Sequence, residues 1–131
     1  MCIFCKIIAG ELPCHKVYED DNTLAFLDIH PLTIGHTLVV PKKHYSRLEE
    51  MPESEFIKLA VAVKKIVAIM SEKLGFIDYK LSQNNGPLAG QEVPHVHFHI
   101  IPRHIDDPIL KRERKEYGPG EAEEIVKKLL S

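Results

Sequence analysis

Residues 95–101 read His-Val-His-Phe-His-Ile-Ile, in which histidine alternates strictly with apolar side chains. Successive side chains of a β-strand point to opposite faces of its sheet, so this segment predicts a strand with all three histidines on one face. The apolar face is expected to pack into a core, and the imidazoles then project together from the other side. The segment therefore predicts a β-sheet with a histidine cluster on one face, made of His95, His97 and His99.

The other apolar patterns predict an α+β domain around this strand. Apolar residues recur at spacings of three and four across 54–74, which predicts one long helix ending at Gly75. Short apolar runs between turn-forming residues predict the remaining strands of an antiparallel sheet of about five strands. The expected helices are 3–12, 54–74 and 121–130, and the expected strands are 17–19, 23–29, 36–40, 79–83 and 95–101.

Length and charge limit the classes of function. A chain of 131 residues suits one domain, which we place at 1–104, with a tail at 105–131 whose helix is expected to pack on the same domain. The net charge of −2 argues against a nucleic-acid partner. Lysines interrupt the apolar runs, so no membrane span is expected. Three cysteines without a visible export signal predict reduced thiols and a cytoplasmic location.

Three interpretations of the histidine cluster follow from the residues alone. It could be a polar strand face, a three-histidine metal site or a nucleophilic centre. A neutral imidazole is a good nucleophile toward phosphorus when its other nitrogen is held as a donor. The loop before the strand contains Asn84, Gly86, Gly90 and Gln91, and it can offer amide donors to phosphate oxygens. This combination favours the nucleophilic centre.

The segment 95–101 also resembles the signature of the histidine triad (HIT) family, His-x-His-x-His followed by two apolar residues. Segments 2–7, 26–29, 35–44 and 84–86 resemble other family motifs in the same order, so the resemblance covers residues 2–104. It implies a HIT-like fold and a homodimer whose two sheets join into one continuous sheet. It also implies a purine nucleotide site in each subunit, where hydrolases or transferases act at the α-phosphate.

The resemblance assigns roles residue by residue. His97 matches the nucleophile that forms a nucleotidyl-histidine intermediate, while His99 and His36 match the histidines that orient and support it. Asp28 matches the acid that binds the ribose hydroxyls, through two acceptor oxygens. The remaining matches are Phe4 and Ile29, with Ile3, Ile7 and Phe26, for the slot of the base, and Asn84 and Gln91 for the phosphate and leaving group.

Two positions refine the predicted activity. The transferase branch carries glutamine where this chain has His99, so the histidine indicates a hydrolase. Glu92 stands where many members have serine or threonine, and an ionised carboxylate cannot donate a hydrogen bond to the leaving group. We expect a hydrolase of purine nucleoside phosphoramidates. The alternatives are a dinucleoside polyphosphate hydrolase and a non-catalytic nucleotide-binding regulator.

The pair Cys2-x-x-Cys5 has the spacing of one half of a zinc site. Two more ligands are needed, and zinc-containing members of the HIT family have histidines at the positions of His44 and His95. A tetrahedral set of two cysteines and two histidines suits a structural zinc, because four protein ligands leave no position for water. The alternative is two reduced, buried thiols.

Overall fold

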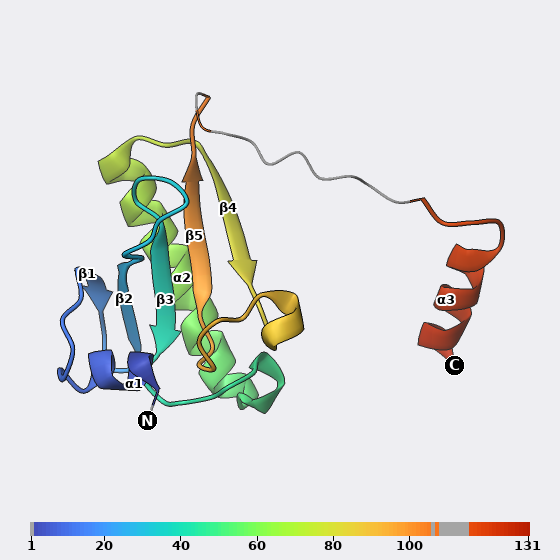
Figure 1. Ribbon diagram of the computed structural model, residues 1–131, viewed down its shortest axis with the longest axis horizontal. Coiled ribbons are helices and arrows are strands. Elements are labelled where there is room, and N and C mark those ends of the chain that lie inside the picture. The colour runs from blue at the N-terminus through green and yellow to red at the C-terminus, as the bar shows by residue number, and fades with distance from the viewer. Residues whose placement is uncertain (1, 106, 108–115) are drawn as a thin grey trace.

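A computed structural model describes residues 2–105, 107 and 116–131, and its centre is a five-stranded sheet of order β1-β2-β3-β5-β4 (Figure 1). Each strand pairs antiparallel with its neighbours. The predicted α+β class and strand number are therefore confirmed. The strands are β1 (Lys16–Glu19), β2 (Thr23–Leu27), β3 (Thr37–Pro41), β4 (Asp78–Gln83) and β5 (Phe98–Arg103).

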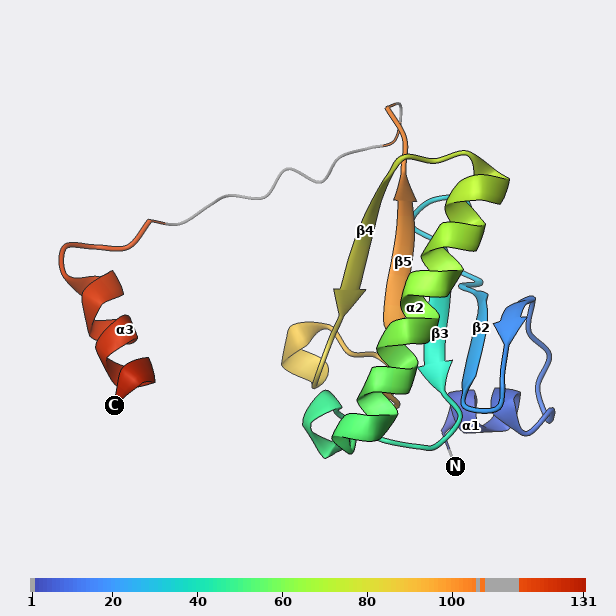
Figure 2. The same cartoon turned by 180° about the vertical axis from the view of Figure 1, so that it is seen from behind.

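One face of the sheet is covered by the long helix α2 (Glu53–Leu74), as Figure 2 shows. Leu59 and Ile66 on α2 are buried in the same core cluster as Val39 on β3 and Ile100 on β5. The helix ends at Gly75, whose φ of +75° lies in the left-handed region that glycine adopts without strain. Within the described part of the chain, no helix is long and apolar enough to cross a bilayer.

A second core cluster lies under the short helix α1 (Ile3–Ile8). Phe4 is buried there with Phe26 on β2 and with Leu38 and Val40 on β3. A helix of six residues has little stability alone, so its place depends on these contacts and on what holds its ends. Two 3-10 turns, η1 (Leu48–Glu50) and η2 (Pro87–Ala89), lie in the connections before α2 and before β5.

The register of the strands sets which residues share a face. Phe26 pairs with Leu38, Leu38 pairs with His99, and His99 pairs with Ser82. Directly paired residues of antiparallel strands point to the same side, so these four form one row across the sheet. His99 therefore lies on the α1 side, in line with the apolar residues under that helix.

The histidine segment differs from its prediction at one end. β5 begins at Phe98 rather than at His95, and it continues through Pro102 to Arg103. Pro94 lacks an N–H, and the N–H of Val96 bonds to the carbonyl of Tyr45 instead of to a strand of the sheet. Residues 95–97 thus form an irregular approach to the strand, which lets neighbouring histidines serve different sites.

The predicted C-terminal helix is present as α3 (Glu121–Leu130). None of its residues is buried, and it stands apart from the sheet in Figures 1 and 2. Its packing on the domain stays a prediction.

Candidate active site

A cavity of about 460 Å³ opens between α1, the loop after β2 and the segment before β5. The three histidines with predicted catalytic roles line it together, which brings residues more than sixty positions apart into one place. Four of the predicted nucleotide-binding residues line the same cavity. The predicted catalytic set is His36, His97 and His99. The predicted nucleotide-binding set is Phe4, Asp28, Ile29 and Asn84.

Backbone groups determine which nitrogen of His97 is reactive. Its Nδ1 lies 2.7 Å from the carbonyl oxygen of His95. A carbonyl can only accept a hydrogen bond, so Nδ1 carries the proton and donates it. The lone pair is then on Nε2. His97 is 5% exposed and lines the cavity, and Nε2 is the nitrogen with the free lone pair that a nucleophile requires.

The same reasoning assigns the other two imidazoles. Nδ1 of His36 accepts the N–H of Leu32 at 3.1 Å, so the proton of His36 is on Nε2. That nitrogen lies 2.9 Å from Nδ1 of His99, which must accept. The proton of His99 is therefore on Nε2. This chain of hydrogen bonds keeps both rings neutral and in fixed orientation.

Burial is the main cause of the electrostatic state of the three cavity histidines, which we call the triad (His36, His97 and His99). It lowers the pKa of His36, His97 and His99, the last to about 4, because a charged imidazole loses its hydration. The carboxylates of Asp28 and Glu92 act in the opposite direction and raise the pKa of His97. Neutral imidazoles at pH 7 suit a nucleophile and its supporting acceptors.

The low pKa of His99 predicts a loss of stability in acid. The unfolded chain protonates this ring near pH 6.5, whereas the folded protein does so only near 4. Between these values the unfolded state binds more protons, so the free energy of unfolding falls as the pH is lowered. We expect a loss of about 2 kcal/mol from this ring, allowing for its partial exposure. Urea unfolding of the wild type and of His99→Gln across this range measures it.

The free energy of unfolding of His99→Gln should depend less on pH than that of the wild type, because glutamine does not titrate. His15→Gln replaces an exposed histidine outside the cavity and should keep the wild-type slope. Equal slopes for the wild type and His99→Gln would contradict the assignment.

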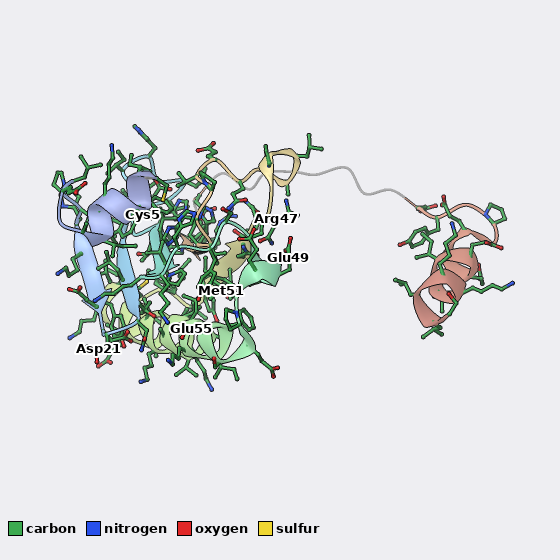
Figure 3. The ribbon with its side chains drawn as sticks, turned by 90° about the horizontal axis from the view of Figure 1, so that it is seen from below. Cys5, Asp21, Arg47, Glu49, Met51 and Glu55 are labelled. Atoms are coloured by element: carbon green, nitrogen blue, oxygen red, sulfur yellow. The ribbon has the colours of Figure 1, made fainter. Side chains whose placement is uncertain are left out.

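A second cluster lies beside the cavity, where α1 meets the segments before α2 and β5. Figure 3 labels Cys5 on α1. Its Sγ lies 3.2 Å from Sγ of Cys2 and 3.3 Å from Nδ1 of His44, and Nδ1 of His44 is 3.1 Å from Nδ1 of His95. Nε2 of His95 lies 2.8 Å from the carbonyl of Pro41 and must donate to it, so Nδ1 presents its lone pair to the cluster. Four donor atoms thus converge within 4.8 Å of one another.

This donor set fits a zinc ion. Thiolate sulfur and imidazole nitrogen are the ligands of closed structural zinc sites, and the second nitrogen of a ligating histidine commonly donates to a carbonyl. Asp28, His36 and His99 form another group of close donor atoms. There Nε2 of His36 carries a proton, because Nδ1 accepts from the backbone. That tautomer disfavours a metal in the second group.

Phe4 connects the two clusters. Its ring packs at steep angles against the rings of His95 and His97, with centroids 5.9 and 5.1 Å away. It stands on α1 between Cys2 and Cys5 in the sequence. Phe4 was predicted to line the slot of the base, and it does line the cavity; its contact with both histidine rings had no signal in the sequence.

Gln91 differs from the other predicted nucleotide-binding residues. Its Oε1 accepts the N–H of Gly86 and its Nε2 donates to the carbonyl of Ser46, both at 2.7 Å. The side chain shapes the loop and is not among the residues that line the cavity, so its contact with a phosphate stays a prediction. Glu92, which the sequence analysis singled out because it replaces the serine or threonine of many family members, lines the cavity.

Comparisons with known proteins agree with this geometry. The family model of the HIT domain matches residues 9–106. An uncharacterized HIT-like protein of Methanocaldococcus jannaschii is 61% identical over 107 residues, which are 82% of each chain. The adenosine 5'-monophosphoramidase of Schizosaccharomyces pombe is 42% identical over 119 residues, covering 91% of this chain and 80% of that protein.

Solved structures show the same fold. A member of the HIT family from Bacillus subtilis is 41% identical and superposes with a TM-score of 0.89, covering 98% of this chain and 94% of that one. A zinc-bound histidine triad family protein from Mycobacterium smegmatis is 36% identical with a TM-score of 0.78, covering 88% and 84%. From the matched domain, these relatives and the triad geometry, we conclude that this chain belongs to the HIT family.

Proposed function

We propose that this protein is a nucleotide hydrolase that cleaves purine nucleoside phosphoramidates at the α-phosphate through a nucleotidyl-histidine intermediate. The observation that carries the proposal is the fixed tautomer of His97: the carbonyl of His95 holds the proton on Nδ1, which leaves the lone pair on Nε2 of a ring that lines the cavity. The phosphoramidase activity of the Schizosaccharomyces pombe relative supports the substrate class.

The reaction has two displacements at phosphorus. Nε2 of His97 uses its lone pair to form a bond to the α-phosphorus, and the bond from phosphorus to the amine nitrogen breaks. The departing nitrogen keeps that electron pair and takes a proton from water. A second water then attacks the phosphorus and gives its proton to the hydroxide that the first water left. The bond from phosphorus to Nε2 breaks and its electron pair returns to Nε2, which releases the nucleoside monophosphate and restores the neutral ring. His99 and His36 hold their orientation throughout, because each is fixed by a hydrogen bond.

Hydrolysis of two substrates side by side tests the proposal. Adenosine phosphoramidate and diadenosine tetraphosphate are compared by kcat/KM under identical conditions. We expect turnover of the phosphoramidate to be favoured by at least tenfold. A preference for the tetraphosphate would assign the protein to the dinucleoside polyphosphate hydrolases. Binding of nucleotide without turnover of either substrate would leave the regulator as the better description.

Asp28 is proposed to bind the ribose hydroxyls. Its carboxyl lines the cavity and is about one-fifth exposed, and Oδ1 already accepts the N–H of His30 at 2.9 Å. Asp28→Asn should raise KM for adenosine phosphoramidate about tenfold, because a hydrogen bond to a charged acceptor is weakened. Steady-state kinetics with the 2',3'-dideoxy substrate provides the control. A substitution effect of the same size on both substrates would show that Asp28 acts elsewhere.

We also propose that Cys2, Cys5, His44 and His95 hold a structural zinc ion. The convergent donor atoms and the zinc-bound relative from Mycobacterium smegmatis support this assignment. When bound, zinc would keep both thiols as thiolates and tie α1 to the segment that carries His97.

Homodimerisation is proposed through the edge of the sheet that β4 forms. β4 is the outermost strand on its side, and it exposes Tyr79 and Leu81. An exposed edge with apolar side chains is a surface that a second strand can cover. Ile77 and Leu88, both at least nine-tenths exposed, add to the exposed apolar surface.

A further inference from the structure

The charged residues that line the cavity are unusual for a nucleotide site. Asp28 and Glu92 are both acidic, and none of the described residues that line the cavity is a lysine or an arginine. His36 and His99 each accept a hydrogen bond at Nδ1 and are therefore neutral. Before a substrate enters, the cavity thus presents two carboxylates and no fixed cation from the described part of the chain.

Two cations on segments that lead toward the site, Arg47 and Lys80, do not line the cavity. Arg47 forms an ion pair with Glu49, and Figure 3 shows the two side chains together before α2. The guanidinium of Arg47 lies against Gly86, in a separate small pocket. Lys80 is on β4, two residues from the partner of His99 in the sheet, and it does not line the cavity. Neither side chain contributes a cation to the cavity wall.

The two carboxylates have different tasks. Oδ1 of Asp28 accepts a backbone N–H and Oδ2 lies 3.7 Å from Nε2 of His36, so Asp28 is part of the framework of the triad. Glu92 is exposed and lies between the loop that contains Asn84 and Gln91 and the histidine His97. Its carboxylate is therefore free to meet the group that leaves the α-phosphate.

We propose that Glu92 selects substrates by the charge of the leaving group, favouring amines that carry a second, cationic group and rejecting anionic leaving groups. This inference rests on the proposed function and refines its substrate class. The physical reason is Coulombic: a carboxylate attracts an ammonium and repels a carboxylate or a phosphate across the same few ångströms. Selection of this kind changes the relative transition-state energies of two substrates without a change in the nucleophile.

The test uses three adenosine 5'-phosphoramidates whose amines have equal length and end in an ammonium, a methyl or a carboxylate group. The amines are 1,3-diaminopropane, butylamine and β-alanine. For each protein the ratio of kcat/KM for the cationic and the anionic substrate is measured. We expect Glu92→Gln to reduce the wild-type ratio about tenfold. The lost charge also acts on His97, but that effect is common to all three substrates, as the butylamine substrate measures, and it cancels in the ratio. Raising the salt concentration from 50 to 300 mM should reduce the wild-type ratio in the same direction.

The matched control is Glu72→Gln on the exposed side of α2, which makes the same change in net charge far from the cavity. An unchanged ratio in Glu92→Gln, or an equal change in Glu72→Gln, would overturn the inference. Dissociation constants of the same compounds with His97→Ala separate it from the proposed function. If affinity follows the charge of the leaving group and this order depends on Glu92, but the wild type hydrolyses none of the compounds, only the phosphoramidase activity is refuted. Hydrolysis by the wild type with a ratio insensitive to Glu92 would refute only the charge selection.

Discussion

His97→Ala should reduce kcat for adenosine phosphoramidate by about 10³-fold or more, because the substitution removes the proposed nucleophile. The neighbouring rings cannot replace it. Nδ1 of His99 accepts from His36, and Nδ1 of His36 accepts from the backbone. Steady-state hydrolysis measures the loss, and affinity for adenosine monophosphate should remain within about threefold of the wild type, since the cavity walls are kept.

A second variant distinguishes loss of the nucleophile from a general disruption of the site. In His97→Asn the side-chain amide can still donate to the carbonyl of His95, but it has no nucleophilic nitrogen. It should be as inactive as the alanine variant and closer to the wild type in stability. His15→Ala removes an exposed imidazole and should keep full activity. Hydrolysis by His97→Asn above one-tenth of the wild-type rate would mean that the reaction does not pass through a nucleotidyl-histidine.

The composition of the site followed from the sequence because its motifs are short and their residue types are specific. Alternation within 95–101 indicated the histidine cluster, and Cys2-x-x-Cys5 indicated half of a metal site. The alternation alone could not show that His95 and His97 point to different sites. His95 turns to the cysteines, while His97 turns to the cavity, because Pro94 keeps this stretch out of the regular strand.

The tautomers of the histidine rings were outside the reach of the sequence for a different reason. That of His99 follows from its contact with Nε2 of His36. The other three are set by main-chain groups: the carbonyl of His95 for His97, the carbonyl of Pro41 for His95 and the N–H of Leu32 for His36. Every residue has such groups, so no residue type marks them. Only the folded backbone decides which carbonyl meets which ring. The engagement of Gln91 with two backbone groups of its surroundings has the same origin.

The proposed zinc site predicts that Cys5→Ser abolishes zinc binding by the purified protein and lowers the free energy of unfolding by about 3 kcal/mol, or the Tm by about 10 °C. Binding at a preformed site stabilises the folded state, and α1, whose six residues give it little stability alone, would lose one of the two sets of contacts that hold it. Metal analysis of the protein and urea unfolding measure the two effects. Cys14→Ser replaces a thiol outside the cluster and should keep the zinc content of the wild type.

The same variant should also lower kcat about tenfold, although Cys5 does not line the cavity. The cluster reaches the nucleophile by two routes. His95 is a proposed zinc ligand, and its own carbonyl holds the proton of His97. Phe4 lies between Cys2 and Cys5 in the sequence, and its ring packs on His97. A small displacement of α1 therefore releases both restraints on the imidazole, and a misplaced nucleophile reacts slowly. If Cys5→Ser lost its metal but kept the wild-type kcat, the cluster would stabilise the fold without positioning His97.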